Sequence, residues 1–431
     1  MNVRSVLLSR PESRGRLVAL AAILLLPSAA AIAQTPAQTP AAILARPDVQ
    51  KAMEVIKASE PHFIDEQVRI SEIPSSPFKE DVRGAELARL FKAAGLVNVR
   101  TDKAGNVLGD RPGTQPKPHL VIAAHLDTVF PPGTDFHVKR TGNILAGPGI
   151  GDDTRGLACL LAVIHAMQET KLKTTGTVTF VANVGEEGQG DLRGMKELFG
   201  NTLKDQIDYF ISVEPGPVER VSNGAVGSYR YKVTVTGPGG HSYGAFGLAN
   251  PIQAISRMGA HIDEMQVPTD PKTTFNMGTV GGGTSVNSIP FSAWFEYDER
   301  SPDSKALDAV DAQFKAAVQK GLDEANARWH DKGKLSVKID TIGVRPAGTT
   351  PIDSDIVQIA TGSIAALGYG KAAYGTSSSD SNIPWHMGIP AVTLGGGGKS
   401  TGAHSLGETE DVTDSYKGPQ NALLIILSIL K

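Results

Sequence analysis

Apolar residues recur at helical spacing in several parts of this 431-residue chain. They fall at i, i+3, i+4 and i+7 in residues 87–94, and the same spacing returns in residues 157–164. This spacing predicts two amphipathic helices, the first ended by Gly95 and the second following Gly156. Another helix is expected near residues 354–367.

Short, unbroken apolar runs lie between these helical segments and predict buried strands. The runs occupy residues 119–124, 178–184, 209–213 and 391–394. Because buried strands alternate with helices, the sequence predicts an α/β domain built on a doubly wound, mostly parallel sheet.

The pattern changes near residue 226. In residues 229–236 apolar side chains alternate strictly with polar ones, as in an antiparallel strand with one face in water. Helices are expected near 250–264 and 303–328, and further strands near 273–281, 291–300 and 335–341. We therefore expect an α+β domain of residues 226–341 to be inserted into the α/β domain, which comprises residues 44–225 and 342–431.

The N-terminus has the three parts of a secretory signal. Residues 4–16 carry four arginines, residues 17–26 form an apolar run too short to span a bilayer comfortably, and Ala31-Ile32-Ala33 offers a cleavage site. We expect a signal peptide of residues 1–33, a flexible leader of residues 34–43, and a periplasmic or secreted protein. The alternative is an uncleaved membrane anchor.

The net charge limits the classes of binding partner, and the cysteine content limits how the fold can be stabilised. The net charge is −3, and cleavage would remove four arginines and one glutamate, which leaves a mildly acidic mature chain. This balance argues against nucleic acid, and against a membrane once the signal is removed. Cys159 is the one cysteine, so no intrachain disulfide can form, and the core, with metal as a possible addition, must stabilise the exported protein.

Histidines and acidic residues follow the predicted strands, where α/β sheets place their sites. The set comprises His125, Asp127, Asp152, Asp153, Glu186, Glu187, Glu214 and His404. Each member alone is open to an ordinary interpretation, as a loop histidine, an acid at a helix start or a solvated acidic loop. Adjacent carboxylates repel, however, unless a metal ion or a proton lies between them.

Taken together, these residues indicate a metal centre. Two histidines and three carboxylates are enough ligands for two zinc ions if one carboxylate bridges them. Mixed nitrogen and oxygen ligands without a thiolate suit Zn²⁺, with Co²⁺ or Mn²⁺ as possible substitutes.

The order and spacing of these residues resemble those of the di-zinc metallopeptidases that include peptidase T, glutamate carboxypeptidase and the aminoacylases. The resemblance covers nearly the whole mature chain. It implies an exopeptidase or amidohydrolase that cleaves small peptides or N-acyl amino acids. It also implies individual roles: His125, Asp152, Glu187, Glu214 and His404 as metal ligands, with Asp152 bridging, Asp127 orienting His125, and Glu186 as the general base.

The same resemblance implies that the inserted domain is a lid that also forms a homodimer. His241, in Gly239-Gly-His241-Ser, matches a lid histidine that steadies the oxyanion. Asn287 and Arg300 match substrate-binding lid residues, and Asp380 lies in a loop that resembles a substrate-facing one. For each of the four, an ordinary strand or turn is the alternative.

Two departures from the family pattern bear on the substrate. Many relatives have lysine after the paired aspartates, where this chain has Thr154 and then Arg155. Peptidase T and several dipeptidases have aspartate at the position of Glu214, whereas glutamate carboxypeptidase and the aminoacylases have glutamate. The second departure weighs against a peptidase T activity without disturbing the metal site.

Two other classes of function compete with this hypothesis. Residues 240–244 satisfy the G-x-S-x-G pattern of serine hydrolases, and Ser242, Asp380 and His404 follow in the required order. The context is wrong, because the preceding strand alternates with polar residues and no helix follows directly. A non-catalytic binding protein is the other candidate, but every expected ligand and base position is filled.

Overall fold

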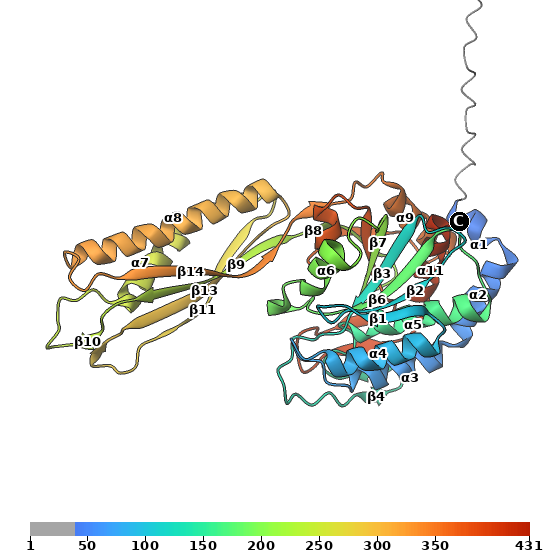
Figure 1. Ribbon diagram of the computed structural model, residues 1–431, viewed down its shortest axis with the longest axis horizontal. Helices are drawn as coiled ribbons and strands as arrows, with labels where there is room; N and C mark the ends of the chain where they lie inside the picture. The colour runs from blue at the N-terminus through green and yellow to red at the C-terminus, as the bar shows by residue number, and fades with distance from the viewer. Residues whose placement is uncertain (1–38) are drawn as a thin grey trace, which may run out of the picture. The chain divides into compact units, whose positions relative to one another are not determined.

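Two large sheets organise the protein in the computed structural model, which describes residues 39–431 (Figure 1). The larger has nine strands in the order β1-β2-β6-β3-β7-β17-β8-β15, with β16 beside β8. Its strands are β1 (Val97–Thr101), β2 (Val107–Arg111), β3 (His119–His125), β6 (Thr177–Asn183), β7 (Tyr209–Glu214), β8 (Arg220–Ala225), β15 (Gly348–Thr349), β16 (Ala373–Ser377) and β17 (Ala391–Gly395).

The four central strands, β6, β3, β7 and β17, are parallel, so their carboxyl ends meet at one edge of the sheet. They are almost wholly buried, as expected for strands covered on both faces. Strands β1, β2 and β15 pair antiparallel toward the two sides. The predicted α/β class is confirmed, and the sheet is mixed, with its parallel part in the centre.

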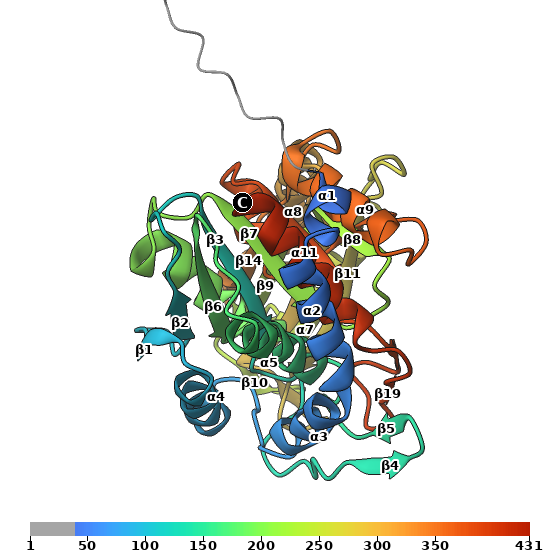
Figure 2. The ribbon, with the colours of Figure 1, turned by 90° about the vertical axis from the view of Figure 1, so that its right-hand side faces the viewer.

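Helices cover both faces of this sheet (Figures 1 and 2). The larger layer contains α1 (Pro40–Leu44), α2 (Pro47–Ala58), α3 (Glu60–Ser71), α4 (Asp81–Ala93), α5 (Thr154–Glu169), α9 (Asp355–Ala366) and α11 (Lys417–Ile429). The opposite face packs against α6 (Arg193–Glu197) and α10 (Asn382–His386). Helix α5 is apolar nearly all round because it lies between the sheet and the outer helices α2, α3 and α11.

The predicted signal peptide, residues 1–33, lies outside the described residues. The expected leader, residues 34–43, is only partly outside them. Residues 40–43 belong to α1, which begins at a proline after the N-cap Thr39, and Ile43 is fully buried in the main core. Residues 40–43 are therefore helical, and the buried Ile43 anchors this short helix on the core.

A small sheet joins two segments that are far apart in the sequence. It contains β4 (Lys139–Thr141), β5 (Ile144–Ala146), β18 (Lys399–Thr401) and β19 (Thr409–Asp411), in the order β18-β19-β5-β4. Pairing of β19 with β5 places the loop after β18 beside the loop that leads from β5 to α5. The sequence did not predict this sheet, because its strands are only three residues long.

The inserted lid domain has its own antiparallel sheet, in the order β11-β13-β9-β14. Its elements are β9 (Gly227–Thr236), β10 (Gly240–His241), α7 (Pro251–Asp263), β11 (Thr274–Gly282), β12 (Ser288–Ile289), β13 (Ser292–Ser301), α8 (Ser304–Arg328) and β14 (Ser336–Arg345). Helices α7 and α8 cover one face, where Val233, Phe295 and Phe314 are fully buried. The alternation that predicted β9 reflects this one-sided packing, and β14 extends to Arg345.

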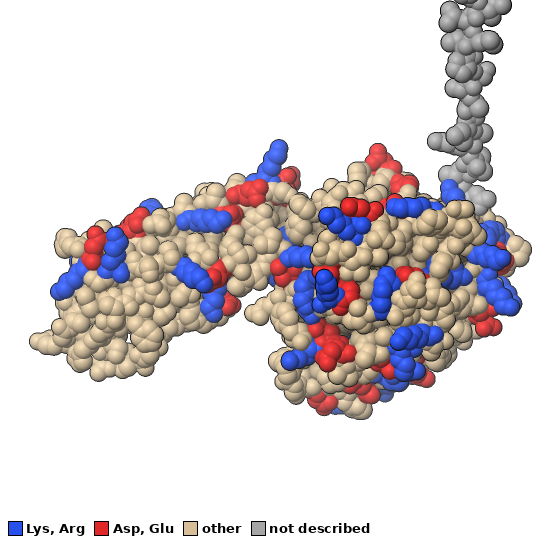
Figure 3. Space-filling view, viewed as in Figure 1, with Lys and Arg blue, Asp and Glu red and all other residues tan. Residues whose placement is uncertain are grey.

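Positive and negative side chains are mixed over most of the face shown in Figure 3. On the face shown in Figure 3, Lys and Arg side chains alternate with Asp and Glu, and the β10–β11 end of the lid carries few charges. Within residues 39–431, no helix combines the length and the apolar character that crossing a bilayer requires.

Candidate metal centre and active site

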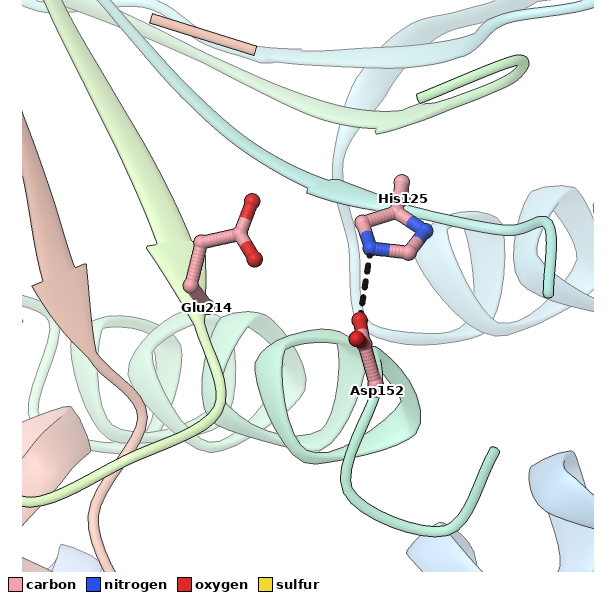
Figure 4. Close-up of side chains that lie close together, drawn as sticks. All are labelled: His125, Asp152 and Glu214. Atoms are coloured by element: carbon pink, nitrogen blue, oxygen red, sulfur yellow. Dashed lines mark hydrogen bonds and ion pairs between the residues drawn. The ribbon is translucent and has the colours of Figure 1, made fainter. Parts of the chain in front are cut away.

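Two of the candidate ligands end parallel strands of the large sheet. His125 is the last residue of β3, and Glu214 is the last residue of β7. Asp152 lies in the loop before α5, and its Oδ1 is 3.0 Å from His125 Nε2. Figure 4 shows these three side chains pointing toward one another. The shared edge of parallel strands therefore brings together residues that are up to 89 positions apart.

Asp152 lies between two histidines. Its Oδ1 faces His125, and its Oδ2 is 3.3 Å from His404 Nε2. The same nitrogen of His404 is 2.9 Å from Glu187 Oε1. A carboxylate that presents one oxygen to each of two ligand groups has the arrangement of a bridging ligand.

The ligand atoms form three groups whose members lie within 4.8 Å of one another. The groups are His125, Asp152 and Glu214; His125, Glu186 and Glu187; and Asp152, Glu187 and His404. The first and third share Asp152 and together contain all five predicted metal ligands. These donors are imidazole nitrogens and carboxylate oxygens, the set that Zn²⁺ accepts.

The carboxylates of this cluster are crowded, and one of their oxygens has no partner. Burial, together with the neighbouring carboxylates, raises the pKa of Glu187 to about 7 and that of Glu214 well above its ordinary value. Within the described residues, the buried Glu214 Oε1 has no hydrogen-bond partner. Hydrogen bonds to Asp152 and Glu187 raise the pKa of His404 to about 10. A divalent cation would relieve this repulsion, so the residues fit a metal centre.

Asp127 contacts His125 through its backbone and the acidic pair through its carboxylate. His125 Nδ1 donates to the backbone oxygen of Asp127 at 2.9 Å, while the nearer carboxylate oxygen is 3.7 Å away. A carbonyl can only accept, so Nδ1 carries a proton, and Nε2, which faces Asp152 Oδ1 at 3.0 Å, is the nitrogen that a metal ion would take. The Asp127 carboxylate instead accepts the backbone N–H groups of Glu186 (3.1 Å) and Glu187 (2.8 Å). It thus fixes the acidic pair as well as the histidine.

The neighbouring acids Asp152 and Asp153 have different positions. Asp153 is fully buried and is the N-cap of α5, where its Oδ1 accepts the N–H of Gly156 at 3.0 Å. Its Oδ2 accepts the backbone N–H of His125 at 3.0 Å. Only Asp152 faces the metal ligands, whereas Asp153 organises the backbone behind them.

Arg345, which sequence reasoning missed, pairs with the predicted general base. Its Nη1 lies 3.0 Å from Glu186 Oε1, and its Nη2 donates to the backbone oxygen of Glu186. Both side chains are buried, and Arg345 Nη1 also donates to Ser378 Oγ at 2.9 Å. The arginine ends β14, 159 residues from Glu186, so no local pattern in the sequence could link the two.

Replacement of Arg345 by methionine is expected to destabilise the metal-free protein by about 3 kcal/mol at pH 8. The change leaves the buried Glu186 carboxylate without its cation, and breaking one side of a buried ion pair is costly. Urea unfolding of chelator-treated protein measures the effect. Arg300→Met is the matched control, since the half-exposed pair of Arg300 with Asp298 should be worth less than about 1 kcal/mol. Equal losses in both variants would contradict the assigned role of the Arg345–Glu186 pair.

The predicted lid residues lie apart from this cluster. His241 is exposed, and its Nδ1 accepts the N–H groups of Tyr243 and Gly244. Strand pairing places His241 opposite Ser288, so the exposed Asn287 is its close neighbour. Among residues 39–431, neither has a hydrogen bond or ion pair to a metal ligand. Both remain candidates for contact with a substrate.

Arg300 lines a cavity of about 400 Å³, which Glu296 and Asp298 line as well. The cavity is also lined by Arg230 of the lid and by Gly188 and Gln189, which directly follow Glu187. Arg230 donates to the backbone oxygen of Gly188 at 2.9 Å and to Asp298, and Arg300 Nε donates to the same carboxylate at 2.8 Å. This cavity is therefore lined both by two cationic side chains of the lid and by the loop that follows Glu186 and Glu187.

Asp380 is fully buried instead of lying on an open substrate loop. Its Oδ2 accepts from Asn183 Nδ2 at 2.7 Å, and Asn183 ends strand β6. Burial and the nearby Glu186 raise the pKa of Asp380 to about 8. Asp380 is therefore a buried neighbour of Glu186, held by Asn183.

The residues of the rival serine hydrolase are not brought together. Ser242 lies in a lid turn, where its N–H donates to Asn287 O. Asp380 is bonded to Asn183, and the Nε2 of His404 faces Asp152 and Glu187. No hydrogen bond joins any two of these three residues within the described chain, so the structure offers no serine triad.

Comparison with known proteins agrees with this geometry. The model of peptidase family M20/M25/M40 matches residues 121–426. Carboxypeptidase G2 of Pseudomonas sp. (strain RS-16) is 30 % identical over 267 residues, covering 58 % of this chain and 62 % of that protein. The protein YqjE of Bacillus subtilis (strain 168) is 25 % identical over 384 residues, covering 85 % of this chain and 98 % of that protein.

A solved structure shows the same fold. Aminopeptidase PepT from Bacillus cereus ATCC 10987 superposes with a TM-score of 0.70 at 22 % identity, covering 86 % of this chain and 99 % of that one. The similarity includes both the α/β domain and the separate antiparallel sheet, so the predicted family and fold class are confirmed.

Proposed function

We propose that this chain, which belongs to peptidase family M20/M25/M40, uses two zinc ions and releases the C-terminal amino acid of its substrate, the one whose α-carboxylate is free. As a member of that family it is a metallo-exopeptidase or amidohydrolase for small peptides or acyl amino acids. The position of Asp152 between His125 and His404 carries the two-ion part of the proposal. His125, Asp152 and Glu214 would hold one ion, and Asp152, Glu187 and His404 the other. Co²⁺ and Mn²⁺ are possible substitutes.

The bound ions would polarise the scissile carbonyl and stabilise charge on its oxygen. The protein supplies the proton transfers. Glu186 takes a proton from the attacking water and returns it to the leaving amine. Because Arg345 occupies Glu186 Oε1, Oε2 is the oxygen that remains for this exchange. Asp127 holds the backbone of Glu186, so the base is fixed at both its main chain and its side chain.

Two observations support a substrate with a free carboxylate. The first is Glu214, since the resembled carboxypeptidases and aminoacylases have glutamate there. The second is the cavity lined by Arg230 and Arg300, because guanidinium groups bind carboxylates well; in this structure Asp298 is the carboxylate that pairs with both. The name of the relative carboxypeptidase G2 agrees with this direction of cleavage. The likeness to the aminopeptidase PepT, at 22 % identity, supports only the fold.

We also propose that the lid forms a homodimer and that the mature protein is periplasmic or secreted. Strand β11 is one of the two edge strands of the lid sheet and is exposed along most of its length. The exposed apolar side chains Val280, Val286 and Phe291 lie on or beside it. A partner chain would cover this surface and could bring His241 to an active site. Sedimentation measures the dimer, and N-terminal sequencing of exported protein measures cleavage near residue 33.

A substrate panel tests the proposed activity. N-acyl amino acids, dipeptides, tripeptides and a peptide with C-terminal glutamate are each assayed with their free carboxylate and as the C-terminal amide, with and without chelator. We expect chelator-sensitive release of the C-terminal amino acid, restored by zinc and lost in the amides. Preferred cleavage after a free N-terminus, with amides accepted, would overturn the proposed direction. Activity that resists chelation would overturn the metal mechanism.

A further inference from the structure

We infer that Glu408, outside the proposed ligand set, is a positioning residue that fixes Asp152 relative to His404 and so sets the metal affinity at the His404 side of the site. The inference rests on the proposed function, because it requires metal ions at these residues. Glu408 begins the segment that leads into β19, four residues after His404. Its side chain belongs to neither the ligand groups nor the proton-transfer residues.

The carboxylate of Glu408 binds the backbone of the loop that carries Asp152. Its Oε1 accepts the N–H groups of Gly151 at 2.8 Å and Asp152 at 2.9 Å, and its Oε2 accepts the N–H of Gly149 at 3.0 Å. The backbone oxygen of Glu408 accepts a fourth N–H, that of Gly147, at 3.1 Å. Glu408 is 1 % exposed, so water does not offer these N–H groups an equivalent partner.

Glycines let the loop pack closely against this carboxylate and against other side chains. A Cβ added at Gly151 would lie 2.6 Å from Ser400 Oγ, 3.0 Å from Glu410 Oε2 and 3.1 Å from Glu408 Oε1, so glycine leaves room for these side chains. Gly149 has a φ of +73°, which favours glycine, and a Cβ there would lie 2.7 Å from Thr128. The two glycines therefore let the loop pack closely against its neighbours, and Glu408 is one of them.

The other end of Glu408 is joined to His404. The N–H of Glu408 donates to Ser405 O at 3.1 Å, and both the N–H and the Oγ of Ser405 donate to Gly402 O. These bonds close a compact turn in which His404 adopts a φ of +65°. One residue thus links the His404 turn, through its backbone, to the Asp152 loop, through its carboxylate.

This link matters most for one of the two ions. Asp152 and His404 come from loops more than 250 residues apart in the chain, and their distance depends on how those loops are joined. His125 and Glu214 are instead placed by neighbouring strands of the large sheet. Loss of the Glu408 contacts should therefore weaken the ion held by Asp152, Glu187 and His404 more than the ion held by His125, Asp152 and Glu214.

Two substitutions separate geometry from charge. Glu408→Gln keeps the shape but turns an NH₂ group toward at least one of the three backbone N–H donors. Glu408→Asp keeps the negative charge but is one methylene too short for the same contacts. Both substitutions should lower the zinc affinity of the site formed by Asp152, Glu187 and His404 by about 10–100-fold, the usual effect of losing a group that orients a ligand. A purely electrostatic effect would spare Glu408→Asp.

The measurement is zinc titration of the full mature chain against a competing chelator, with bound zinc counted at each free-zinc concentration. The matched control is Asp102→Asn, because Asp102 Oδ1 also accepts three backbone N–H groups, those of Ala104, Gly105 and Asn106, but not in a ligand loop. Thermal unfolding of the metal-free variants checks that each one folds.

We expect two zinc ions in wild type and Asp102→Asn, and one ion with normal affinity plus one weakened ion in both Glu408 variants. Two ions of unchanged affinity in the Glu408 variants, or the same weakening in Asp102→Asn, would overturn the inference. If Glu408→Gln fails to fold, Glu408→Asp decides. Wild type without zinc would instead overturn the proposed function, so the two failures are distinguishable.

Discussion

Replacement of Glu186 by glutamine is expected to lower kcat by roughly 10²–10⁴-fold while both metal ions stay bound. Glutamine keeps the size of the side chain and can still meet Arg345 through its carbonyl oxygen, but it cannot accept a proton from water. Glu186 is buried and is held in place by Asp127 and Arg345. Steady-state kinetics together with metal analysis of the same preparation measures the effect.

The matched control for this variant is Glu80→Gln. Glu80 is also buried and ion-paired, with Arg193 at 2.6 Å, but it is not a member of the ligand groups. It should keep kcat within a few-fold of wild type, whatever it costs in stability. Normal activity of Glu186→Gln with both ions bound would exclude the base role. Loss of metal together with activity would show that Glu186 is a ligand instead, as its place beside His125 and Glu187 also allows.

Replacement of Asp152 by asparagine is expected to have the second large effect. Asp152 offers one oxygen to each metal group, and burial, which opposes ionisation, is outweighed by hydrogen bonds from His125 and His404 that lower its pKa. Asparagine removes the charge and one oxygen acceptor. We expect weaker binding of both ions and a fall in activity of at least about 10³-fold, because metal-ion stabilisation worth about 4 kcal/mol is lost.

The adjacent residue provides the comparison. Asp153→Asn removes a buried carboxylate whose pKa is raised well above its ordinary value by burial and by Asp152, so loss of its charge should be tolerated. Asparagine is also a good N-cap through its amide oxygen, but its NH₂ group then faces the backbone N–H of His125, which Asp153 Oδ2 accepts in the wild type. Asp153 itself belongs to none of the ligand groups, so this variant should keep both ions and most of its activity, with a decrease in thermal stability. Metal content and activity of the two variants, measured side by side, decide the matter. Similar behaviour of both would contradict the bridging position of Asp152.

The ligand set was predictable because parallel strands deliver their ends to one edge. His125 and Glu214 directly end strands, and Glu186 and Glu187 follow one at a short distance, so short apolar runs were enough to bring them together. The rest of the site depends on backbone geometry that a residue pattern does not reveal. Glu408 and Arg345 act through contacts between loops and strands that are 159 or more residues apart.

Roles were harder to predict than positions. Asp127 was expected to orient His125, and its backbone oxygen does so, whereas its carboxylate accepts the backbone N–H groups of Glu186 and Glu187. Asp152 and Asp153 are equivalent in the sequence, yet the start of α5 turns only one of them toward the ligands. The direction of a side chain at the start of a helix depends on the geometry of the cap, which two adjacent aspartates in a sequence do not specify.

The central claim is that this chain holds two metal ions that share Asp152. The most direct measurement is a crystal structure of zinc-loaded protein with anomalous data collected at the zinc edge. The account predicts two anomalous peaks, one beside His125 and Glu214 and one beside Glu187 and His404, with Asp152 touching both. A single peak, two peaks without a shared Asp152, or none at these residues would contradict it.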